Sequence, residues 1–197
     1  LPAMQGGHIT FGCFNNMAKW NTDLYEMRIE VLKEVPDSRL RLKARTLLDA
    51  PVRNELVEFF KSKGIEESRL EFSGHTPSIA QHLAEYNKVD IALDSYPYHG
   101  TTTTCESMWM GVPVVTLCGD FHLARVGASL LAAVGLNELV ADSRKNYVQV
   151  AVKLASDREK LVQLRAGFRE RMLASPLMNA KAFARNMGNL IASAVKK

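Results

Sequence analysis

Cysteine is scarce in this chain of 197 residues, and the cysteines that occur form no recognisable pattern. Cys13, Cys105 and Cys118 are odd in number and widely spaced, which argues against the disulfide framework of a small secreted protein. The sequence also lacks CxxC, HExxH and any Cys/His cluster, so we expect no zinc site built by the protein. These absences predict a reduced, cytoplasmic protein without a bound metal.

Long apolar runs are absent as well. No stretch of about 18 apolar residues occurs, so no segment is expected to span a membrane. Residues 1–12 have no basic region followed by an apolar stretch, so we do not expect them to be a signal peptide. The chain is 47% apolar and 23% charged, a composition typical of a globular domain with its own hydrophobic core.

Positive charge is concentrated towards the C-terminus. Residues 158–197 contain nine Lys or Arg and two Asp or Glu, a net charge of +7, so the remainder carries −3 of the overall +4. The two interpretations are solvated faces of C-terminal helices and a surface for an acidic partner. Because this region has only Phe168 and Phe183 as aromatic residues and matches no nucleic-acid motif, we expect neither nucleic acid nor membrane as a partner.

Strand-like and helix-like segments alternate along the chain. Short β-branched or apolar runs predict strands over residues 8–15, 38–43, 69–72, 89–93 and 112–117. Helical spacing predicts helices over residues 22–35, 51–63, 78–87, 101–110, 122–133, 144–156, 158–173 and 179–195. This order predicts an α/β fold, a Rossmann-like parallel sheet with helices on both faces. We divide the chain into a Rossmann-like domain over residues 8–157 and C-terminal helices over residues 158–197.

The common nucleotide-binding signatures are missing: the chain has neither the P-loop pattern nor GxGxxG. Ligands of open parallel sheets bind beyond the carboxyl ends of the strands, so the loops after the predicted strands are the places to inspect. The first of these loops contains Asn16 and Lys19, which could bind a phosphate or form an ordinary polar turn. The third leads to His82, which is either a structural histidine or a ligand contact.

The loop after the fourth predicted strand is the most informative. Gly100 is followed by four threonines, Thr101–Thr104, which suit the start of a helix better than its interior. Free N–H groups and the helix dipole attract anions there, and glycine lets the backbone approach closely, so we expect a phosphate or diphosphate site. Glu106 would repel phosphate and is expected to bind ribose hydroxyls instead. The alternative is an elaborate helix cap without a ligand.

Several segments, taken in order, resemble a known family. They are FGCFNNMAKW, RLEFSGHTPSIAQHLAEY, DIALDSYPYHGTTTTCESMWMGVPVVTL, RVGASLLAAVGLNELVA and RMLASPLMNAKAFAR, spread over nearly the whole chain. These segments are similar to the protein O-GlcNAc transferases and equally to the SPINDLY-type protein O-fucosyltransferases. The resemblance implies the C-terminal, nucleotide-sugar-binding domain of a GT-B glycosyltransferase, in which two Rossmann-like domains face each other across a cleft.

The resemblance also implies a reaction, the inverting and metal-independent transfer of a sugar from a nucleotide sugar to Ser or Thr of an acceptor protein. The donor substrate is a UDP-sugar or a GDP-sugar, and no cofactor is implied; a non-catalytic binding module is the alternative. The remaining implied partners are the N-terminal catalytic half and the TPR repeats of the same chain, which this sequence does not contain. The general base is expected in that half.

Matched position by position, the resemblance assigns roles to single residues. Lys19 corresponds to the lysine that stabilises the leaving diphosphate, and Asn16 stands where animal enzymes have a glutamine near the phosphates. His82 corresponds to a histidine at the base, and Glu106 to an acidic residue that holds the ribose.

Thr102 and Thr103 correspond to threonines at the diphosphate, whereas Thr101 stands where animal enzymes have a histidine. Two positions depart from the animal pattern, because Ile79 replaces a base-contacting lysine and Glu85 replaces an arginine. The sequence therefore does not choose between uridine and guanosine.

Overall fold

The computed structural model describes residues 1–195, in which six parallel strands form one sheet. The strands are β1 (Thr10–Cys13), β2 (Arg39–Lys43), β3 (Leu70–Ser73), β4 (Ile91–Leu93), β5 (Val114–Leu117) and β6 (Val140–Ala141). Their order across the sheet is β3-β2-β1-β4-β5-β6, so the chain reverses its direction of winding between β1 and β4. This confirms the predicted α/β, Rossmann-like fold.

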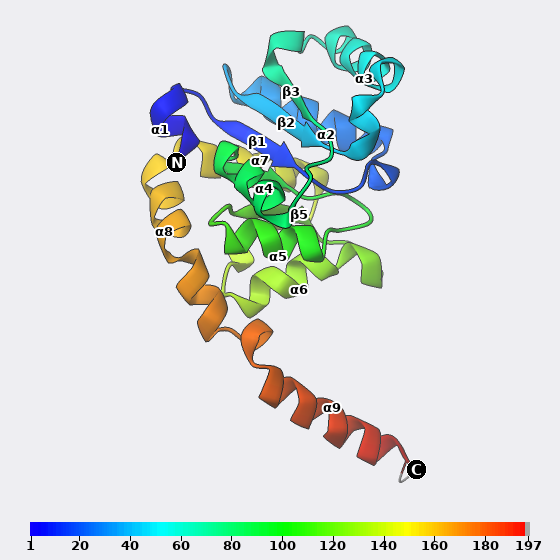
Figure 1. The fold of residues 1–197 in the computed structure, drawn as a ribbon, viewed down its shortest axis with the longest axis vertical. Coiled ribbons are helices and arrows are strands. Elements are labelled where there is room, and N and C mark those ends of the chain that lie inside the picture. Colours follow the sequence, from blue (N-terminus) through cyan, green and yellow to red (C-terminus); the bar gives the residue numbers. More distant parts are fainter. Residues whose placement is uncertain (196–197) are drawn as a thin grey trace.

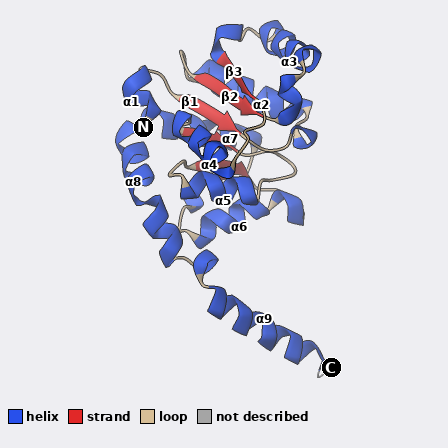
Figure 2. Cartoon of the chain, in the orientation of Figure 1, coloured by secondary structure: helices blue, strands red, loops and turns tan. Residues whose placement is uncertain are grey.

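Helices cover both faces of the sheet (Figures 1 and 2). The α-helices are α1 (Pro2–Gly6), α2 (Thr22–Glu34), α3 (Ala50–Ser62), α4 (Ile79–Ala84), α5 (Thr102–Trp109), α6 (Val126–Ala133), α7 (Arg144–Ser156), α8 (Arg158–Ala174) and α9 (Ala180–Val195). α2 and α7 pack side by side on one face, and α5 and α6 lie together on the other. The two layers enclose a core in which β1 and β5 are buried along their whole length.

Local sequence signals explain where several elements begin and end. Asn21 precedes α2, and its side chain accepts a hydrogen bond from the Leu24 N–H at 2.8 Å. Gly64 follows α3 with a φ of +84°, a left-handed conformation that favours glycine. The apolar runs of β1 and β5 are continuous because parallel strands in such a sheet are covered on both faces.

Two elements were not predicted, and two predicted helices are shorter than expected. β6 has only two residues, too few for an alternating pattern, and α1 is a single turn held by the buried Asp90, whose carboxylate accepts from the N–H groups of Ala3 and Thr10. The predicted helix over 122–133 is a 3-10 turn followed by α6, and that over 78–87 is α4 followed by a 3-10 turn. The predicted strand over 8–15 shortens to β1.

The basic C-terminal region divides into two parts. α8 packs on the domain, and its arginines bind backbone carbonyls: Arg165 donates to Val89 O at 2.9 Å and Tyr86 O at 3.1 Å, and Arg171 donates to Val134 O at 3.2 Å. The interpretation of a purely solvated basic face is therefore wrong for these two arginines. The residues that α8 buries are Leu161, Leu164, Phe168 and Met172.

α9 has no buried residue and projects away from the rest of the described chain (Figure 1). Its large apolar side chains follow helical spacing on one face and are exposed; they are Phe183, Met187, Leu190 and Ile191. Within residues 1–195, no helix is long and apolar enough to cross a membrane. The predicted domain boundary between residues 157 and 158 stays a prediction. α8 contributes residues to the core of the domain, whereas α9 does not.

The core contains an unusual cation. Arg28, in α2, is 0% exposed, and none of its three guanidinium nitrogens has a hydrogen-bond partner among the described residues. Its guanidinium carbon lies 5.1 Å from the centroid of the Trp20 ring, a cation–π contact. A buried charge without hydrogen bonds costs free energy that a single aromatic face does not offset.

Replacing Arg28 with methionine should therefore stabilise the fold. Arg28→Met keeps a flexible side chain of similar length and removes the desolvated charge, so the free energy of unfolding should rise by about 1–4 kcal/mol in urea titrations. The exposed Arg45 provides the control, because Arg45→Met should change stability by less than about 0.5 kcal/mol. A lower stability of Arg28→Met would show that the guanidinium has partners that this geometry lacks.

Candidate functional site

The polar loops identified in the sequence meet where the sheet changes its direction of winding. β1 pairs with β2 on one side and with β4 on the other, so the connections leaving β1 and β4 diverge and open a crevice at the carboxyl ends of these strands. The loop after β1 carries Asn16 and Lys19, and the loop after β4 carries Gly100 and leads into α5. The structure thus brings Lys19 and the threonine-rich helix start together.

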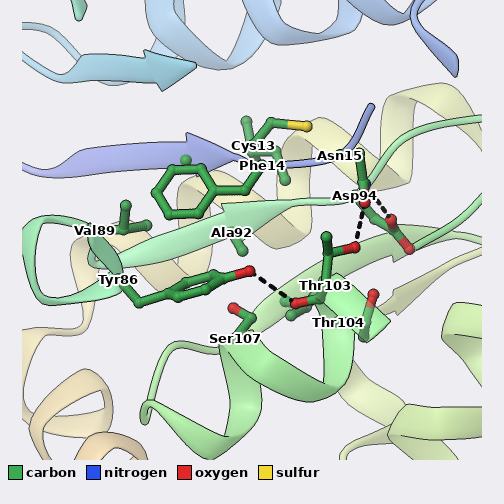
Figure 3. Close-up of a pocket in the computed structure, with 13 residues that line it drawn as sticks. Cys13, Phe14, Asn15, Tyr86, Val89, Ala92, Asp94, Thr103, Thr104 and Ser107 are labelled. Atoms are coloured by element: carbon green, nitrogen blue, oxygen red, sulfur yellow. Dashed lines mark hydrogen bonds between the residues drawn. The ribbon is translucent and has the colours of Figure 1, made fainter. Parts of the chain in front are cut away.

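Asn15 joins the two loops (Figure 3). Its amide nitrogen donates to Asp94 Oδ1 at 3.1 Å and to Ser95 Oγ at 2.9 Å, and its amide oxygen accepts a hydrogen bond from the Thr103 hydroxyl. One buried side chain therefore fixes β1, the loop after β4 and the first turn of α5 to one another. The sequence indicated only that Asn15 ends a strand, and did not single it out.

Asp94 lies beneath this junction and is 3% exposed. Its Oδ1 accepts from the Gly100 N–H at 2.8 Å, and its Oδ2 accepts from the Thr116 hydroxyl at 3.0 Å. Burial raises the pKa of Asp94, while the hydrogen bonds from Gly100, Thr116 and Asn15 stabilise its charged form. The carboxylate acts as a hydrogen-bond hub for the loop, and it too was missed from the sequence.

His99 fixes the same loop from the side of β5. It is 0% exposed, its Nδ1 accepts from the Gly127 N–H at 2.9 Å, and its Nε2 lies 2.8 Å from Leu117 O. Because a carbonyl can only accept, the ring hydrogen belongs on Nε2 and the imidazole is neutral. A neutral histidine with both nitrogens satisfied is a structural group, and it sets the position of the backbone carbonyl that precedes Gly100.

Lys19 donates a hydrogen bond to the backbone carbonyl of His99. It ends a short 3-10 helix (Met17–Lys19), its Nζ donates to His99 O at 2.8 Å, and the ammonium lies 3.8 Å from the centroid of the Tyr98 ring. Partial burial lowers the pKa of Lys19, and the charge of Asp94 acts in the opposite direction. The cation is therefore held beside the first turn of α5, with two of its three N–H groups left over from the bond to His99.

The start of α5 is open to a ligand. Across the described residues 1–195, no side chain caps its N-terminus, and Thr101 and Thr102 are exposed. The Thr103 hydroxyl is engaged with Asn15. Free N–H groups at a helix N-terminus beside a lysine are groups with which proteins commonly bind anions.

Gly100 was expected to make room for a ligand, but the structure gives a different reason for glycine. A Cβ at this position would lie 2.7 Å from Asn15 Oδ1 and would also collide with the hydroxyls of Thr103 and Thr104. The residue is therefore glycine because protein groups converge on it.

A second group, the histidine cluster (Lys43, His82, Tyr86 and Glu106), lies beyond the first turn of α5. His82 Nε2 lies 2.9 Å from Glu106 Oε2, and His82 Nδ1 lies 2.9 Å from Lys43 Nζ. The Tyr86 hydroxyl donates to Glu106 Oε2 at 3.3 Å and to Thr103 O at 3.2 Å. His82 and Glu106, the residues expected at the base and the ribose, are thus paired with each other. Burial raises the pKa of the Tyr86 hydroxyl.

Some residues singled out in the sequence lie away from both groups. The Asn16 side chain is used as a cap, since its Oδ1 accepts from the Ala18 N–H at 3.0 Å, and Ile79 is 78% exposed. Glu85 is bound by Arg41 at 2.6 Å and Lys88 at 2.7 Å. Burial opposes the ionisation of Glu85, but the hydrogen bonds from Lys88 and Arg41 outweigh it and hold its pKa at about 2.

The pocket at the carboxyl ends of β1 and β4 is small and partly open. A cavity of about 20 Å³ is lined by residues that include Phe14, Tyr86, Asp94 and Thr103 (Figure 3), and it has room for about one water molecule. A ligand larger than a water molecule would therefore extend outside this pocket. Cys105 is half-buried against the core. No group of three or more His, Cys, Asp or Glu residues among positions 1–195 could hold a metal ion.

Comparison with known proteins agrees with this geometry. Residues 3–187 match the family model described as Glycosyl transferase family 41. A "Probable UDP-N-acetylglucosamine--peptide N-acetylglucosaminyltransferase SPINDLY" of Arabidopsis thaliana is 41% identical over 183 residues, 93% of this chain and 20% of the relative. The UDP-N-acetylglucosamine--peptide N-acetylglucosaminyltransferase of Caenorhabditis elegans is 31% identical over 191 residues, 96% of this chain and 16% of the relative. The chain spans about a fifth of the length of the curated relatives it matches.

Solved structures show the same fold. A mutant O-GlcNAc transferase of Thermobaculum terrenum superposes with a TM-score of 0.88 at 34% identity, over 94% of this chain and 35% of that chain. The Anabaena protein HepE, solved in complex with UDP and glucose, superposes with a TM-score of 0.64 at 18% identity, over 95% of this chain and 51% of that chain. The second likeness concerns the fold alone.

The close packing around Asp94 predicts the effect of one added methyl group. In Gly127→Ala, the new Cβ would lie 2.7 Å from Asp94 Oδ2 and 3.0 Å from His99 Nδ1, so the variant should lose about 1–3 kcal/mol of unfolding free energy in urea titrations. Gly167, also inside a helix, has no atom within 4 Å of such a Cβ. Gly167→Ala should be neutral or gain up to about 1 kcal/mol, and equal effects at both positions would contradict the tight junction.

Proposed function

The chain belongs to glycosyl transferase family 41, and we propose that it is the donor-binding half of an inverting, metal-independent protein O-glycosyltransferase. In this proposal the enzyme moves GlcNAc from UDP-GlcNAc to Ser or Thr side chains of proteins. The observation that carries the proposal is the uncapped N-terminus of α5 beside Lys19, at the point where the sheet changes its direction of winding. The names of the relatives, which are peptide N-acetylglucosaminyltransferases, support the choice of donor and acceptor.

Departure of the nucleotide is the step for which this half is equipped. As the bond between the sugar and the diphosphate breaks, negative charge develops on the diphosphate. N–H groups at the start of α5 and the ammonium of Lys19 would meet that charge with dipoles and a cation that are already oriented. Thr101 and Thr102 are exposed at the same turn and would add hydroxyl donors. The residues thus supply the stabilisation for which other enzymes use a metal ion.

The nucleoside would lie across the histidine cluster. Glu106 follows the first turn of α5, so a ligand with its diphosphate at that turn would bring its ribose hydroxyls to this carboxylate. His82 lies beside the aromatic rings of Phe14 and Tyr86, with ring centroids 6.3 and 5.8 Å away, which gives the base an aromatic edge to pack against.

The second candidate donor is GDP-fucose. The observation that favours it is the state of the two positions that depart from the animal pattern: Ile79 carries no charge and is exposed, and Glu85 is bound by Arg41 and Lys88. Neither position offers a cation to a uracil.

Calorimetric titration of the chain with UDP, GDP and their sugar conjugates, with and without magnesium, tests which donor is bound. Metal-independent preference for UDP supports the leading proposal, and preference for GDP supports the alternative.

Catalysis would require the rest of the protein. We place the general base and the acceptor-binding groups in the N-terminal catalytic half, preceded by TPR repeats, and expect no transfer of sugar to peptide by residues 1–197 alone. Robust transfer by this chain alone would contradict that division of work.

Lys19→Ala should weaken the binding of a nucleoside diphosphate by about tenfold to a hundredfold, because a charge-assisted hydrogen bond is lost. The binding of the matching nucleoside should change little, since the nucleoside lacks the diphosphate. Calorimetry with UDP and uridine measures both, and Lys33→Ala, on an exposed position of α2, is the control. Equal losses of affinity for UDP and for uridine would show that Lys19 does not contact the diphosphate.

The exposed apolar face of α9 should be covered in the full-length protein by the N-terminal catalytic half. Amide hydrogens of α9 should exchange within seconds in residues 1–197 alone and much more slowly in the full-length protein, where packing restrains opening of the helix. Leu190→Glu should restore fast exchange, whereas Asn189→Glu, on the opposite face, should not. Fast exchange of α9 in the unmodified full-length protein would contradict this packing.

A further inference from the structure

Lys43 is a buried cation that the proposed function leaves without a role. It is the last residue of β2, it is 8% exposed, and its Nζ lies 2.9 Å from Nδ1 of His82. Burial lowers the pKa of Lys43, and the charges of Glu85 and Glu106 act in the opposite direction. Since Glu85 is already bound by two other cations, Glu106 is the carboxylate that balances Lys43 across the histidine ring.

The contacts of Lys43 decide which nitrogen of His82 carries the hydrogen. An ammonium group can only donate hydrogen bonds, so the nitrogen that faces it, Nδ1, must be the acceptor. The ring hydrogen is then on Nε2, where it is donated to Glu106 Oε2 at 2.9 Å. Lysine, histidine and glutamate thus form a line of donors and acceptors that runs in one direction only.

This line fixes one oxygen of Glu106 and leaves the other free. Oε2 accepts from His82 and, at 3.3 Å, from the Tyr86 hydroxyl. Within the described part of the chain, no hydrogen bond is made to Oε1. An oriented carboxylate with one free oxygen is well suited to accept hydrogen bonds from a pair of ribose hydroxyls.

The helix that carries His82 depends on such polar contacts. α4 has six residues and none of them is fully buried; Leu83 packs partly buried against a small apolar cluster, and polar contacts add to what holds the helix in place. His82 connects it to β2 through Lys43 and to α5 through Glu106. If Lys43 were absent, the ring could carry its hydrogen on Nδ1, and Nε2 would then face the carboxylate as a second acceptor and repel it.

We propose that Lys43 is a positioning residue of the nucleotide site, which selects the Nε2–H form of His82 and so orients Glu106 towards the ribose of the donor. This inference rests on the proposed function for its ligand, but not for the state of His82. Lys43 itself touches neither the ribose nor the base in this scheme. Its effect on binding is therefore expected to pass through the hydroxyls that Glu106 holds.

The state of His82 can be measured without any ligand. Nitrogen-15 chemical shifts of the imidazole in residues 1–197 should show hydrogen on Nε2 alone. Lys43→Met should give a mixture of the two neutral forms, and Lys43→Arg, whose guanidinium also only donates, should keep the Nε2–H form. Hydrogen on Nδ1 in the unmodified chain would overturn the proposal. This test does not depend on whether any variant folds.

Binding of two nucleotides, with and without ribose hydroxyls, tests whether Lys43 acts through Glu106. Lys43→Met should weaken UDP binding by about tenfold, the scale seen when a group that orients a ligand-binding residue is removed, and Lys43→Arg should restore most of it. A 2′,3′-dideoxy form of UDP should bind both the unmodified chain and Lys43→Met with nearly the same affinity. Equal losses for the two nucleotides would mean that Lys43 acts directly on the phosphates, and would overturn the positioning role.

The outcomes separate the two proposals. If the unmodified chain binds neither UDP nor GDP, the proposed function fails, while the nitrogen shifts still decide whether Lys43 sets the form of His82. If the chain binds UDP and Lys43→Met keeps both the Nε2–H form and the affinity, the proposed function stands and the role of Lys43 fails. Lys88→Met, at an exposed lysine outside the cluster, is the matched control for loss of one positive charge.

Discussion

The site depends on a buried carboxylate. Asp94 directly follows β4 at the point where the sheet changes its winding, and it receives hydrogen bonds from Asn15, Gly100 and Thr116. Without this side chain, the N–H of Gly100 would be a buried donor with no acceptor and the Asn15 amide would keep only its bond to Ser95 Oγ, and an unpaired buried donor costs more than its bond contributes. These bonds hold the backbone before α5 and, with it, the His99 carbonyl that accepts a hydrogen bond from Lys19. A rigid scaffold positions the cation.

α5 connects the two polar groups of the crevice. Its first turn offers N–H groups to an anion, and Thr103 in that turn is tied to Asn15 by its hydroxyl and to Tyr86 by its carbonyl. Glu106 projects from the next turn into the histidine cluster. Because each group uses a residue or N–H groups of this short helix, any shift of its start would move the proposed diphosphate and ribose positions together. Orientation of both ends of a nucleotide by one element is what a leaving-group site requires.

The sequence predicted the sheet, most helices and the crevice because those depend on local patterns. Apolar runs, helical spacing and the threonines at a helix start are all visible within about ten residues. It did not reveal Asn15, Asp94 or Lys43 as parts of the site, because their partners lie far away in the chain and ordinary polar residues at strand ends look alike. Gly100 shows the same limit: its identity was noticed, but its reason, the convergence of Asn15 and threonine hydroxyls, required coordinates. The two-residue β6 was too short for any pattern.

The distribution of apolar and polar surface argues that the crevice is one wall of a larger site. The partly open pocket there has room for about one water molecule, so a nucleotide bound as proposed would keep much of its surface in solvent. Charge stabilisation by Lys19 and a helix N-terminus is strongest when water is excluded, which a single open wall cannot do. α9 meanwhile extends away from the domain with Phe183, Met187 and Leu190 uncovered. A second domain that packs against α9 and closes over the crevice would change both features together. The same association would bury the apolar face of α9 and exclude water from the proposed diphosphate site.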